Sequence, residues 1–265
     1  MRRSIWIGYD PREVEAFAVC RHSLRRHAPN IPIHAVVLDE LRAANLYRRP
    51  TSKRDGRLWD DISDAPMSTE FACSRFLTAN LAARTSPDAE WALFMDCDIL
   101  ARDDVNKLFA LADPSKAVMC VQHPNYNPPD AIKMDGQLQL LYARKNWSSV
   151  MLFNLNHEGN QRLTVGMINQ IPGRDLHRFC WLNDEEIGAL PQEWNYLVGV
   201  TDQAINPALV HFTSGGPWFE GYASVEYAGE WLSARRQWLE DDQRGIRLMP
   251  RAEPRPAIHS NGVAR

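Results

Sequence analysis

The sequence lacks the long apolar run of a membrane-spanning helix, because nowhere in its 265 residues do about 18 apolar residues follow one another. Its opening stretch, MRRSIWIGYD, carries two arginines but only a short apolar segment, which is too short for a secretory signal. Cysteine is scarce: the five cysteines are widely spaced and form no C-x-x-C pair, which argues against a disulfide framework or a zinc finger. We therefore expect no transmembrane anchor and predict a reducing, cytoplasmic location.

An excess of basic residues is also absent, since 30 Lys and Arg face 33 Asp and Glu and the formal charge is −3. Such a chain has no basic field to attract nucleic acid, so we expect no nucleic-acid partner, although a single basic pocket for a small phosphate ligand is compatible with it. Apolar residues make up 45%, and a chain of this length can bury a sizeable core without disulfides. We predict one domain over residues 1–248 and a flexible, proline- and charge-rich tail over residues 249–265.

The order of apolar and polar segments predicts an α/β fold. Residues 4–8 form a short apolar strand, 10-DPRE-13 has the capping pattern of a helix that would run to about residue 26, and residues 31–38 form a second buried strand. This strand–helix–strand start predicts an open, mostly parallel sheet flanked by helices. The polar residues 39–67 are predicted to form a long irregular loop. Further strands are expected at 91–95, 117–122, 148–155 and 208–212, and further helices at 68–84, 104–112, 159–169, 183–190 and 224–241.

Two aspartates follow the apolar strand in 91-WALFMDCDIL-100. Ligands of open α/β sheets bind beyond the carboxyl ends of the strands, which is where Asp96 and Asp98 are expected. Residues separated by one intervening residue on an extended segment face the same side, so both carboxylates can converge on one hard cation such as Mg²⁺ or Mn²⁺. Cys97 would point away from both and is expected to be a small buried spacer. The alternative is that one aspartate caps the next helix and the other is solvated.

A histidine at another strand end favours the metal site. His211 lies in 208-ALVHF-212, directly before the glycine-rich loop 213-TSGGPWFEG-221. A neutral imidazole is a good third ligand for Mn²⁺ or a similar ion. A single strand-end histidine is more often structural, but the aspartate pair and the neighbouring 215-GGPW-218 favour a ligand.

Arg75 and three aromatic residues each have two interpretations. Arg75 lies among alanines, off the apolar face of its predicted helix, and either reaches across a cleft or is solvated at the surface. Trp194, Trp218 and Phe219 either stack on sugar rings or pack in the core. Their spacing in the sequence does not decide between these roles.

From Ser4 to about Phe219 the sequence resembles the nucleotide-sugar glycosyltransferases of the GT-A fold, most closely glycosyltransferase family 8. The resemblance rests on an ordered set of motifs: 5-IWIGYDPREVEAF-17, 68-STEFACSRFL-77, 91-WALFMDCDIL-100, 149-SVMLFNL-155, 191-PQEWNYL-197 and 211-HFTSGGPW-218. Each motif is weak to moderate alone, whereas the ordered combination is fairly specific. It implies a metal-dependent hexosyltransferase that moves a sugar from a nucleotide-diphosphate donor, with a UDP-sugar favoured, to a hydroxyl of a glycan, lipid or protein, with retention of anomeric configuration.

The resemblance also implies roles for particular residues. Asp96, Asp98 and His211 would hold Mn²⁺ or Mg²⁺ against the donor diphosphate. Tyr9 and Asp10 would meet the nucleoside, and the remaining donor contacts would come from Arg75, Asp96, Cys97, Gly215, Gly216 and Trp218. The acceptor would contact Trp194, Asn195 and Phe219. Catalytic roles would fall to Arg75, which assists the leaving diphosphate, and to Asp184 and Glu185, which loosely match a polar pair near the reacting carbon.

Departures from the family pattern bear on these roles. The family often has H-x-x-G-x-x-K-P-W, whereas here the loop is one residue shorter and Gly216 precedes Pro217 where a lysine is expected. The diphosphate then lacks that cation unless Arg75, an arginine of residues 39–67 or backbone N–H groups replace it. An asparagine–small–glycine motif is replaced by Trp147-Ser148-Ser149, and Glu185 stands where glutamine is common.

Alternatives remain for both mechanism and function. Retention can proceed by double displacement, with Asp184 or Glu185 as the candidate nucleophile, or by same-face attack guided by the leaving phosphate. A haloacid dehalogenase-type phosphatase also uses D-x-D after a strand, usually near the start of its domain. A sugar nucleotidyltransferase is disfavoured because 8-GYDPRE-13 is not a glycine-rich, basic phosphate loop. A degenerate transferase that binds a nucleotide sugar without turnover is motivated by the missing lysine.

Overall fold

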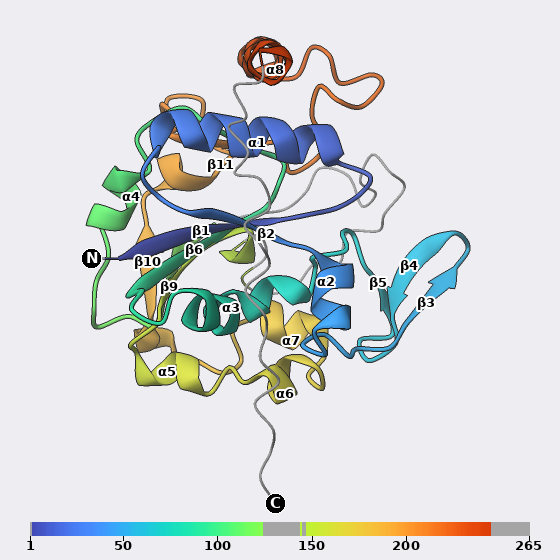
Figure 1. Cartoon of the computed structure of the whole chain (residues 1–265), viewed down its shortest axis with the longest axis vertical. Coiled ribbons are helices and arrows are strands. Elements are labelled where there is room, and N and C mark those ends of the chain that lie inside the picture. Colours follow the sequence, from blue (N-terminus) through green and yellow to red (C-terminus); the bar gives the residue numbers. More distant parts are fainter. Residues whose placement is uncertain (1, 124–143, 145–146, 245–265) are drawn as a thin grey trace, which may run out of the picture.

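The computed structural model describes residues 2–123, 144 and 147–244, and its framework is a six-stranded sheet (Figure 1). From one edge to the other the strands are β10 (Ile187–Leu190), β8 (Val118–Val121), β9 (Val150–Asn154), β6 (Trp91–Met95), β1 (Arg3–Gly8) and β2 (Ile33–Val36). All neighbours pair in parallel except at β9, which runs antiparallel to β6 and β8. The expected α/β fold with an open, mostly parallel sheet is confirmed.

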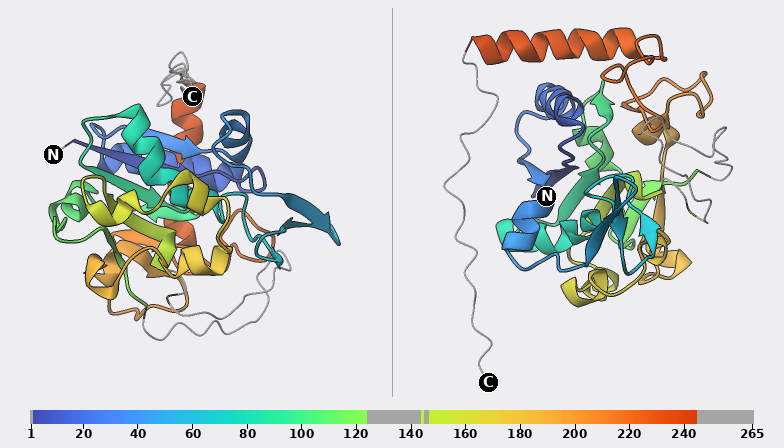
Figure 2. Two further views of the ribbon diagram at one scale, coloured as in Figure 1. Left: turned by 90° about the horizontal axis from the view of Figure 1, so that it is seen from below. Right: turned by 90° about the vertical axis from the view of Figure 1, so that its right-hand side faces the viewer.

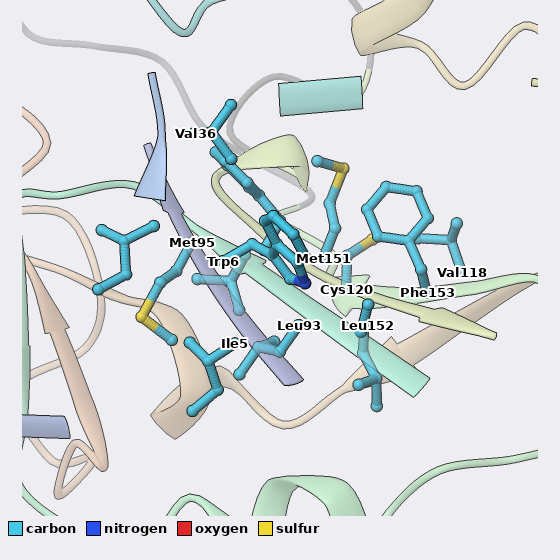
Figure 3. Packing of buried hydrophobic residues seen from close by; sticks show 14 of the residues in the cluster. Ile5, Trp6, Val36, Leu93, Met95, Val118, Cys120, Met151, Leu152 and Phe153 are labelled. Carbon is cyan, nitrogen blue, oxygen red and sulfur yellow. The ribbon is translucent and has the colours of Figure 1, made fainter. Parts of the chain in front are cut away.

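Both faces of this sheet are covered, which explains why its strands read as continuous apolar runs. Every residue of β6 and β9 is buried. Helix α1 (Val14–His27) covers one face, and α3 (Thr78–Thr85) packs against β6 and β9 on the other (Figure 1). Figure 3 shows the resulting core, in which Leu93, Leu152 and Phe153 pack in one cluster with side chains of β1 and β8.

A smaller sheet follows directly from the end of β6. It contains β11 (Tyr196–Leu197), β12 (Leu209–His211) and β7 (Ile99–Ala101). Because β12 pairs antiparallel with β7, His211 lies opposite Ile99 and therefore beside the turn that carries Asp96 and Asp98. Helix α4 (Asn106–Ala110) comes next, and the Asp104 carboxylate accepts a hydrogen bond from the backbone N–H of Asn106 at 2.9 Å.

The last helix, α8 (Ala228–Gln243), crosses over the outer side of α1 (Figures 1 and 2). The Arg235 guanidinium contacts the Glu15 carboxylate at 2.6 Å, and His22 Nε2 lies 3.0 Å from Asp241 Oδ2. Only Ala228 and Trp231 of α8 are buried, so polar pairs carry much of this helix contact. No helix within the described ranges is long and apolar enough to cross a bilayer.

The prediction of an irregular loop over residues 39–67 is wrong. The segment contains α2 (Leu38–Ala43) and a three-stranded antiparallel sheet of β3 (Thr51–Arg54), β4 (Arg57–Asp60) and β5 (Ala65–Pro66). This sheet projects from the body of the molecule, so it buries little and lacks a regular apolar alternation (Figure 1). Asp55 and Gly56 at its tip both have positive φ, as a tight hairpin turn requires. The Asp-Gly pair is the sequence signal for such a turn.

Several predicted helices begin elsewhere or are interrupted. Asp10 does not cap α1, because its carboxylate accepts a hydrogen bond from the Arg12 backbone N–H at 2.9 Å and the helix starts at Val14. The 68–84 helix is reduced to the 3-10 turn η1 (Ser74–Leu77) and α3. The 159–169 helix is divided into α5 (Glu158–Gln161) and α6 (Val165–Ile168), because the Thr164 hydroxyl caps α6 by accepting from the Met167 N–H.

The predicted helix at 183–190 is a further error. Its residues form the short 3-10 turn η3 (Asp184–Glu186) followed by strand β10. Other elements that were not predicted are β7, β11, α7 (Gly173–His177) and the 3-10 turns η2 (Trp147–Ser149) and η4 (Gln192–Asn195). The tail at 249–265 lies outside the described residues.

Candidate metal centre

Three side chains with metal-ligating atoms meet where β6 ends. Asp96 and Asp98 come from the turn between β6 and β7, and His211 is the last residue of β12. Each offers one ligand atom, and these atoms lie within 4.8 Å of one another. His211 Nε2 is 3.3 Å from Asp98 Oδ1, and the imidazole is almost fully buried. The structure thus brings together the three residues for which the sequence predicts a metal site.

The chemistry of these groups fits a divalent cation. Two carboxylate oxygens and one imidazole nitrogen form a donor set of the type that binds Mn²⁺ and related ions. Two carboxylates so close to one another repel unless a cation lies between or beside them. These residues could therefore hold one divalent metal ion.

Cys97 separates the two aspartates but is not placed to share in binding. Its side chain is buried, and burial raises the pKa of the thiol well above its ordinary value. A protonated thiol is a poor metal ligand. Cys97 is thus buried and outside the cluster, as expected of a spacer in an extended segment, and its donor contact stays a prediction.

Asn195 contacts the side of His211 that faces away from Asp98. Its Oδ1 lies 2.9 Å from His211 Nδ1, and its Nδ2 lies 2.9 Å from Ser149 Oγ and 3.1 Å from His123 Nε2. Burial, with a smaller contribution from His211, lowers the pKa of His123 to about 4, so its ring is neutral at pH 7. Asn195 itself is fully buried, so an acceptor cannot contact it in this arrangement. Ser149 lies in the motif 149-SVMLFNL-155 but was given no role from the sequence, and His123 was not singled out.

Arg75 reaches the same cluster from η1. Its Nη1 donates to Asp96 Oδ1 at 2.7 Å and to the Ser148 carbonyl at 2.9 Å. The guanidinium carbon lies 5.1 Å from the ring centre of Phe71 and 5.2 Å from that of Phe94. Arg75 is therefore buried and pairs with Asp96 of the candidate site, and the interpretation as a solvated surface arginine is wrong.

The predicted nucleoside residues follow β1. Asp10 is fully buried, and both of its oxygens accept hydrogen bonds, from Arg12 and from the Glu70 backbone N–H. Burial opposes ionisation, but the hydrogen bonds and charge of Arg12 outweigh it and lower the pKa of Asp10 below its ordinary value. The Tyr9 ring is half-buried and meets the Phe17 ring edge-on, with centroids 5.2 Å apart. Asp10 thus acts in this structure as an anchor for Arg12 and for the chain at Glu70.

The loop after His211 is held by its own aromatic residues. The Trp218 ring contacts Phe212, Phe219 and Trp231, with centroids 5.2 to 5.7 Å apart. It lies directly against Gly216, where an added Cβ would approach the ring to 2.1 Å. The Gly215 N–H donates to the Phe212 carbonyl at 2.7 Å. Trp218 therefore links this loop to α8.

The predicted acceptor residues differ in exposure. Trp194 is 3% exposed and belongs to the main core, so its ring packs there. Phe219 is partly exposed beside Trp218, and an acceptor contact at Phe219 stays a prediction.

Asp184 and Glu185 lie at the other end of the sheet. They precede β10, whose first residue Ile187 is in register with Val118, Phe153 and Ala92 across the sheet. From Ala92 to Asp96 the strand direction alone covers about 13 Å. Lys116, which precedes β8, donates to the Glu185 carbonyl at 2.8 Å. The structure therefore does not bring Asp184 and Glu185 to the ligand cluster, because β10 replaces the expected helix and runs from them toward the site.

Comparison with known proteins identifies one relative by sequence and several solved structures with a similar fold. No protein-family model matches the sequence. Protein CDI of Arabidopsis thaliana is 40% identical over 246 residues, which cover 91% of this chain and 88% of that protein. Among solved structures, the apo bifunctional glycosyltransferase WbbM has a TM-score of 0.57 at 15% identity, over 92% of this chain. The chain spans about half of WbbM, with 51% covered.

The galactosyltransferase LgtC, solved with donor and acceptor sugar analogues, is similar over most of both chains. Its TM-score is 0.53 at 16% identity, with 88% of this chain and 95% of LgtC covered. At such identities the likeness concerns the fold. The central sheet, its flanking helices and the smaller sheet that follows β6 are therefore those of a GT-A glycosyltransferase fold.

Proposed function

The chain belongs to the family of Arabidopsis thaliana protein CDI, and we propose that it is a metal-dependent glycosyltransferase that moves a sugar from a nucleotide-diphosphate donor to a hydroxyl acceptor. One observation carries the proposal: Asp96, Asp98 and His211 converge at the carboxyl end of β6 in a fold shared with glycosyltransferases. This is the sheet edge at which α/β proteins bind their ligands. We further propose membership of glycosyltransferase family 8 on the ordered motifs from Ser4 to Phe219.

The metal in this proposal is Mn²⁺ or Mg²⁺. Asp96, Asp98 and His211 would hold it, and an imidazole among the ligands favours Mn²⁺ over Mg²⁺. When bound, the ion supplies positive charge that stabilises the leaving nucleoside diphosphate. The favoured donor is a UDP-sugar.

Arg75 is proposed to set the charge and orientation of Asp96. Its guanidinium is buried between Phe71 and Phe94 and donates to both Asp96 and the Ser148 carbonyl. Because this cation is fixed before any ligand arrives, it can favour anionic donor groups near the cluster without reorganisation. It also stands in for the lysine that the loop at 213–221 lacks.

The chain's own carboxylates bear on the choice between the two retaining routes. Asp184 and Glu185 precede β10, at the amino ends of the parallel strands, whereas Asp96 follows the carboxyl end of β6. A nucleophile must lie within contact distance of the anomeric carbon. We therefore propose retention by same-face attack, in which the acceptor hydroxyl attacks on the side that the diphosphate leaves and passes its proton to a donor phosphate oxygen.

The five free cysteines, four of them buried, support the proposal of a reducing, cytoplasmic location. The haloacid dehalogenase alternative has no support from the fold, which is that of glycosyltransferases. A non-catalytic nucleotide-sugar-binding role is a second candidate, favoured by the missing lysine before Pro217.

A thermal-shift screen followed by a turnover assay tests the proposal. We expect one class of nucleotide sugar to raise Tm only when Mn²⁺ or Mg²⁺ is present, because ligands that bind the native state stabilise it by mass action. The same donor should then be hydrolysed slowly, and transferred when hydroxyl acceptors are added. Tight donor binding with neither hydrolysis nor transfer would favour the non-catalytic role. Release of phosphate from simple phosphomonoesters, with no response to nucleotide sugars, would favour a phosphatase.

A further inference from the structure

The hydrogen bonds around His211 place a second residue in control of the metal centre. We propose that Asn195 is a positioning residue that holds His211 in the one tautomer and ring orientation able to bind a divalent cation. The inference rests on the proposed metal-dependent function and goes beyond it, because it replaces the acceptor-binding role predicted for Asn195.

The fold sets Asn195 against His211. Asn195 ends η4 and is followed directly by β11, which pairs in parallel with β12 so that Leu197 lies opposite His211. Asn195 Oδ1 is 2.9 Å from His211 Nδ1, and both residues are almost completely shielded from water. Solvent therefore does not compete for this bond in the wild type.

The amide is fixed on its other side as well. Its Nδ2 lies 2.9 Å from Ser149 Oγ and 3.1 Å from His123 Nε2. The Ser149 carbonyl in turn accepts from the Asp96 backbone N–H at 2.9 Å. Asn195 thus connects the strand of the histidine ligand to the chain at an aspartate ligand, and rotation of its side chain would break these three contacts.

Tautomer choice is what this arrangement controls. A neutral imidazole carries one proton, and a nitrogen that binds metal must be unprotonated. If the proton is on Nδ1, Asn195 Oδ1 accepts it and the Nε2 lone pair faces the ligand cluster. If the proton is on Nε2, it faces Asp98 Oδ1 at 3.3 Å and blocks metal binding. Asn195 stabilises the first state, and without it the carboxylate of Asp98 favours the second.

Direct metal binding by the full chain, freed of metal with EDTA, gives the first test. Free Mn²⁺ would be followed by electron paramagnetic resonance during titration, with no nucleotide present. Removal of a hydrogen-bond partner behind a metal-ligating histidine typically costs 10- to 100-fold in affinity, so we expect Asn195→Ala to raise the Mn²⁺ Kd by about that factor. Asn195→Asp, which keeps an acceptor oxygen for Nδ1–H, should restore a Kd closer to that of the wild type.

Asn160 provides a matched control. It is also a buried asparagine, and its Nδ2 donates to the Ala117 carbonyl at 2.6 Å and the Asn154 carbonyl at 2.9 Å. It lies at the end of the sheet away from the ligands, beside the start of β8. Asn160→Ala should lower Tm but leave the Mn²⁺ Kd within about threefold of the wild type, whereas a merely structural role for Asn195 would give both variants the same pattern.

A spectroscopic measurement keeps the proposal testable if Asn195→Ala fails to fold. Long-range ¹H–¹⁵N spectra of metal-free wild type distinguish a protonated from an unprotonated ring nitrogen, and we expect the His211 proton on Nδ1. A proton on Nε2, or an Asn195→Ala protein that folds and binds Mn²⁺ as the wild type does, would overturn the inference. Wild type that binds no Mn²⁺ would overturn the proposed function as well, while Asn195-dependent Mn²⁺ binding without sugar transfer would count against the transferase proposal alone.

Discussion

Arg75 Nη1 lies 2.7 Å from Asp96 Oδ1, so one carboxylate of the candidate metal centre is already paired with a buried cation from a different part of the chain. The pair joins η1 to the end of β6 and therefore fixes the position of Asp96 before any ligand binds. Breaking a buried pair by removing one partner leaves the other charge uncompensated, which is costly in a water-poor site.

Arg75→Ala should therefore destabilise the protein in a metal-dependent way. In EDTA we expect the free energy of unfolding to fall by about 3 kcal/mol, because Asp96 is left without its partner. Saturating Mn²⁺ should recover part of the loss, since it supplies the missing positive charge. Urea denaturation in both conditions measures this. Arg235→Ala, which removes a half-exposed pair with Glu15, is the control and should cost less than about 1 kcal/mol in either condition.

A second buried pair, between Arg49 and Asp60, predicts a pH dependence of stability. Arg49 Nε lies 2.8 Å from Asp60 Oδ1, and both side chains are at most 2% exposed. Burial opposes ionisation of Asp60, but the hydrogen bonds from Arg49 and Ser63 outweigh it and hold the pKa below its ordinary value. A carboxyl whose pKa is lowered by folding stabilises the protein above its unfolded pKa of about 3.9, and this contribution is lost as the pH falls through the folded pKa.

The free energy of unfolding should thus decline steadily when the pH is lowered below about 4, with Asp10 contributing in the same sense. Chemical denaturation at pH 5, 4 and 3 measures the slope. Asp60→Asn should be less stable at pH 5 and should show a shallower decline, because one of the titrating groups is gone. An equal slope in wild type and variant would contradict the assignment to Asp60.

Asp184→Ala and Glu185→Ala should each leave kcat within about twofold of the wild type. Both residues precede β10, at the amino-terminal end of the strand, and neither belongs to the cluster of Asp96, Asp98 and His211. Steady-state transfer assays check this, with Asp98→Ala as the positive control for loss. A drop of about 1,000-fold in either variant would restore the double-displacement route.

Gly216→Ala tests the packing of the loop at 213–221. An added methyl would approach the Trp218 ring to 2.1 Å, so we expect a loss of about 1–3 kcal/mol in stability, typical of overpacking. The double variant Gly216→Ala, Trp218→Phe should recover part of this loss because the smaller ring leaves room. Gly229, where an added Cβ meets nothing within 4 Å, gives a control substitution to Ala with little or no loss. Thermal unfolding measures these variants and Trp218→Phe alone, and additive effects in the double variant would show that the ring is not the obstacle.

The ligand cluster was predictable because its signals are local. The turn at Asp96 and Asp98 follows an uninterrupted apolar strand, and His211 ends another, so strand direction alone places them at one sheet edge. The pairing of β12 with β7, which sets His211 beside Asp98, has no local signal and needed the structure. The contacts of Arg75 and Asn195 have no local signal either, because their hydrogen-bond partners, Asp96 and His211, lie 21 and 16 positions away in the sequence.

The errors also have physical causes. The sheet at 51–66 buries little and is held by one buried pair, Arg49 with Asp60, so apolar periodicity could not reveal it. At 183–190 the acidic run suggested a helix, but Asn183 and Glu186 form a capping box around a single 3-10 turn, and the apolar Ile187–Leu190 continues as an edge strand. Residues 187–190 form a strand and not a helix because they pair with β8.

The most direct measurement of the central claim is release of nucleoside diphosphate from a nucleotide-sugar donor by wild type and by Asp98→Ala, each with Mn²⁺ and with EDTA. The account predicts turnover only for wild type with Mn²⁺, and a loss of at least about 100-fold in Asp98→Ala, since removing several kcal/mol of charge stabilisation changes the rate tenfold for every 1.36 kcal/mol. Wild-type turnover that persists in EDTA, or an Asp98→Ala protein that turns over the donor as fast as wild type, would contradict it.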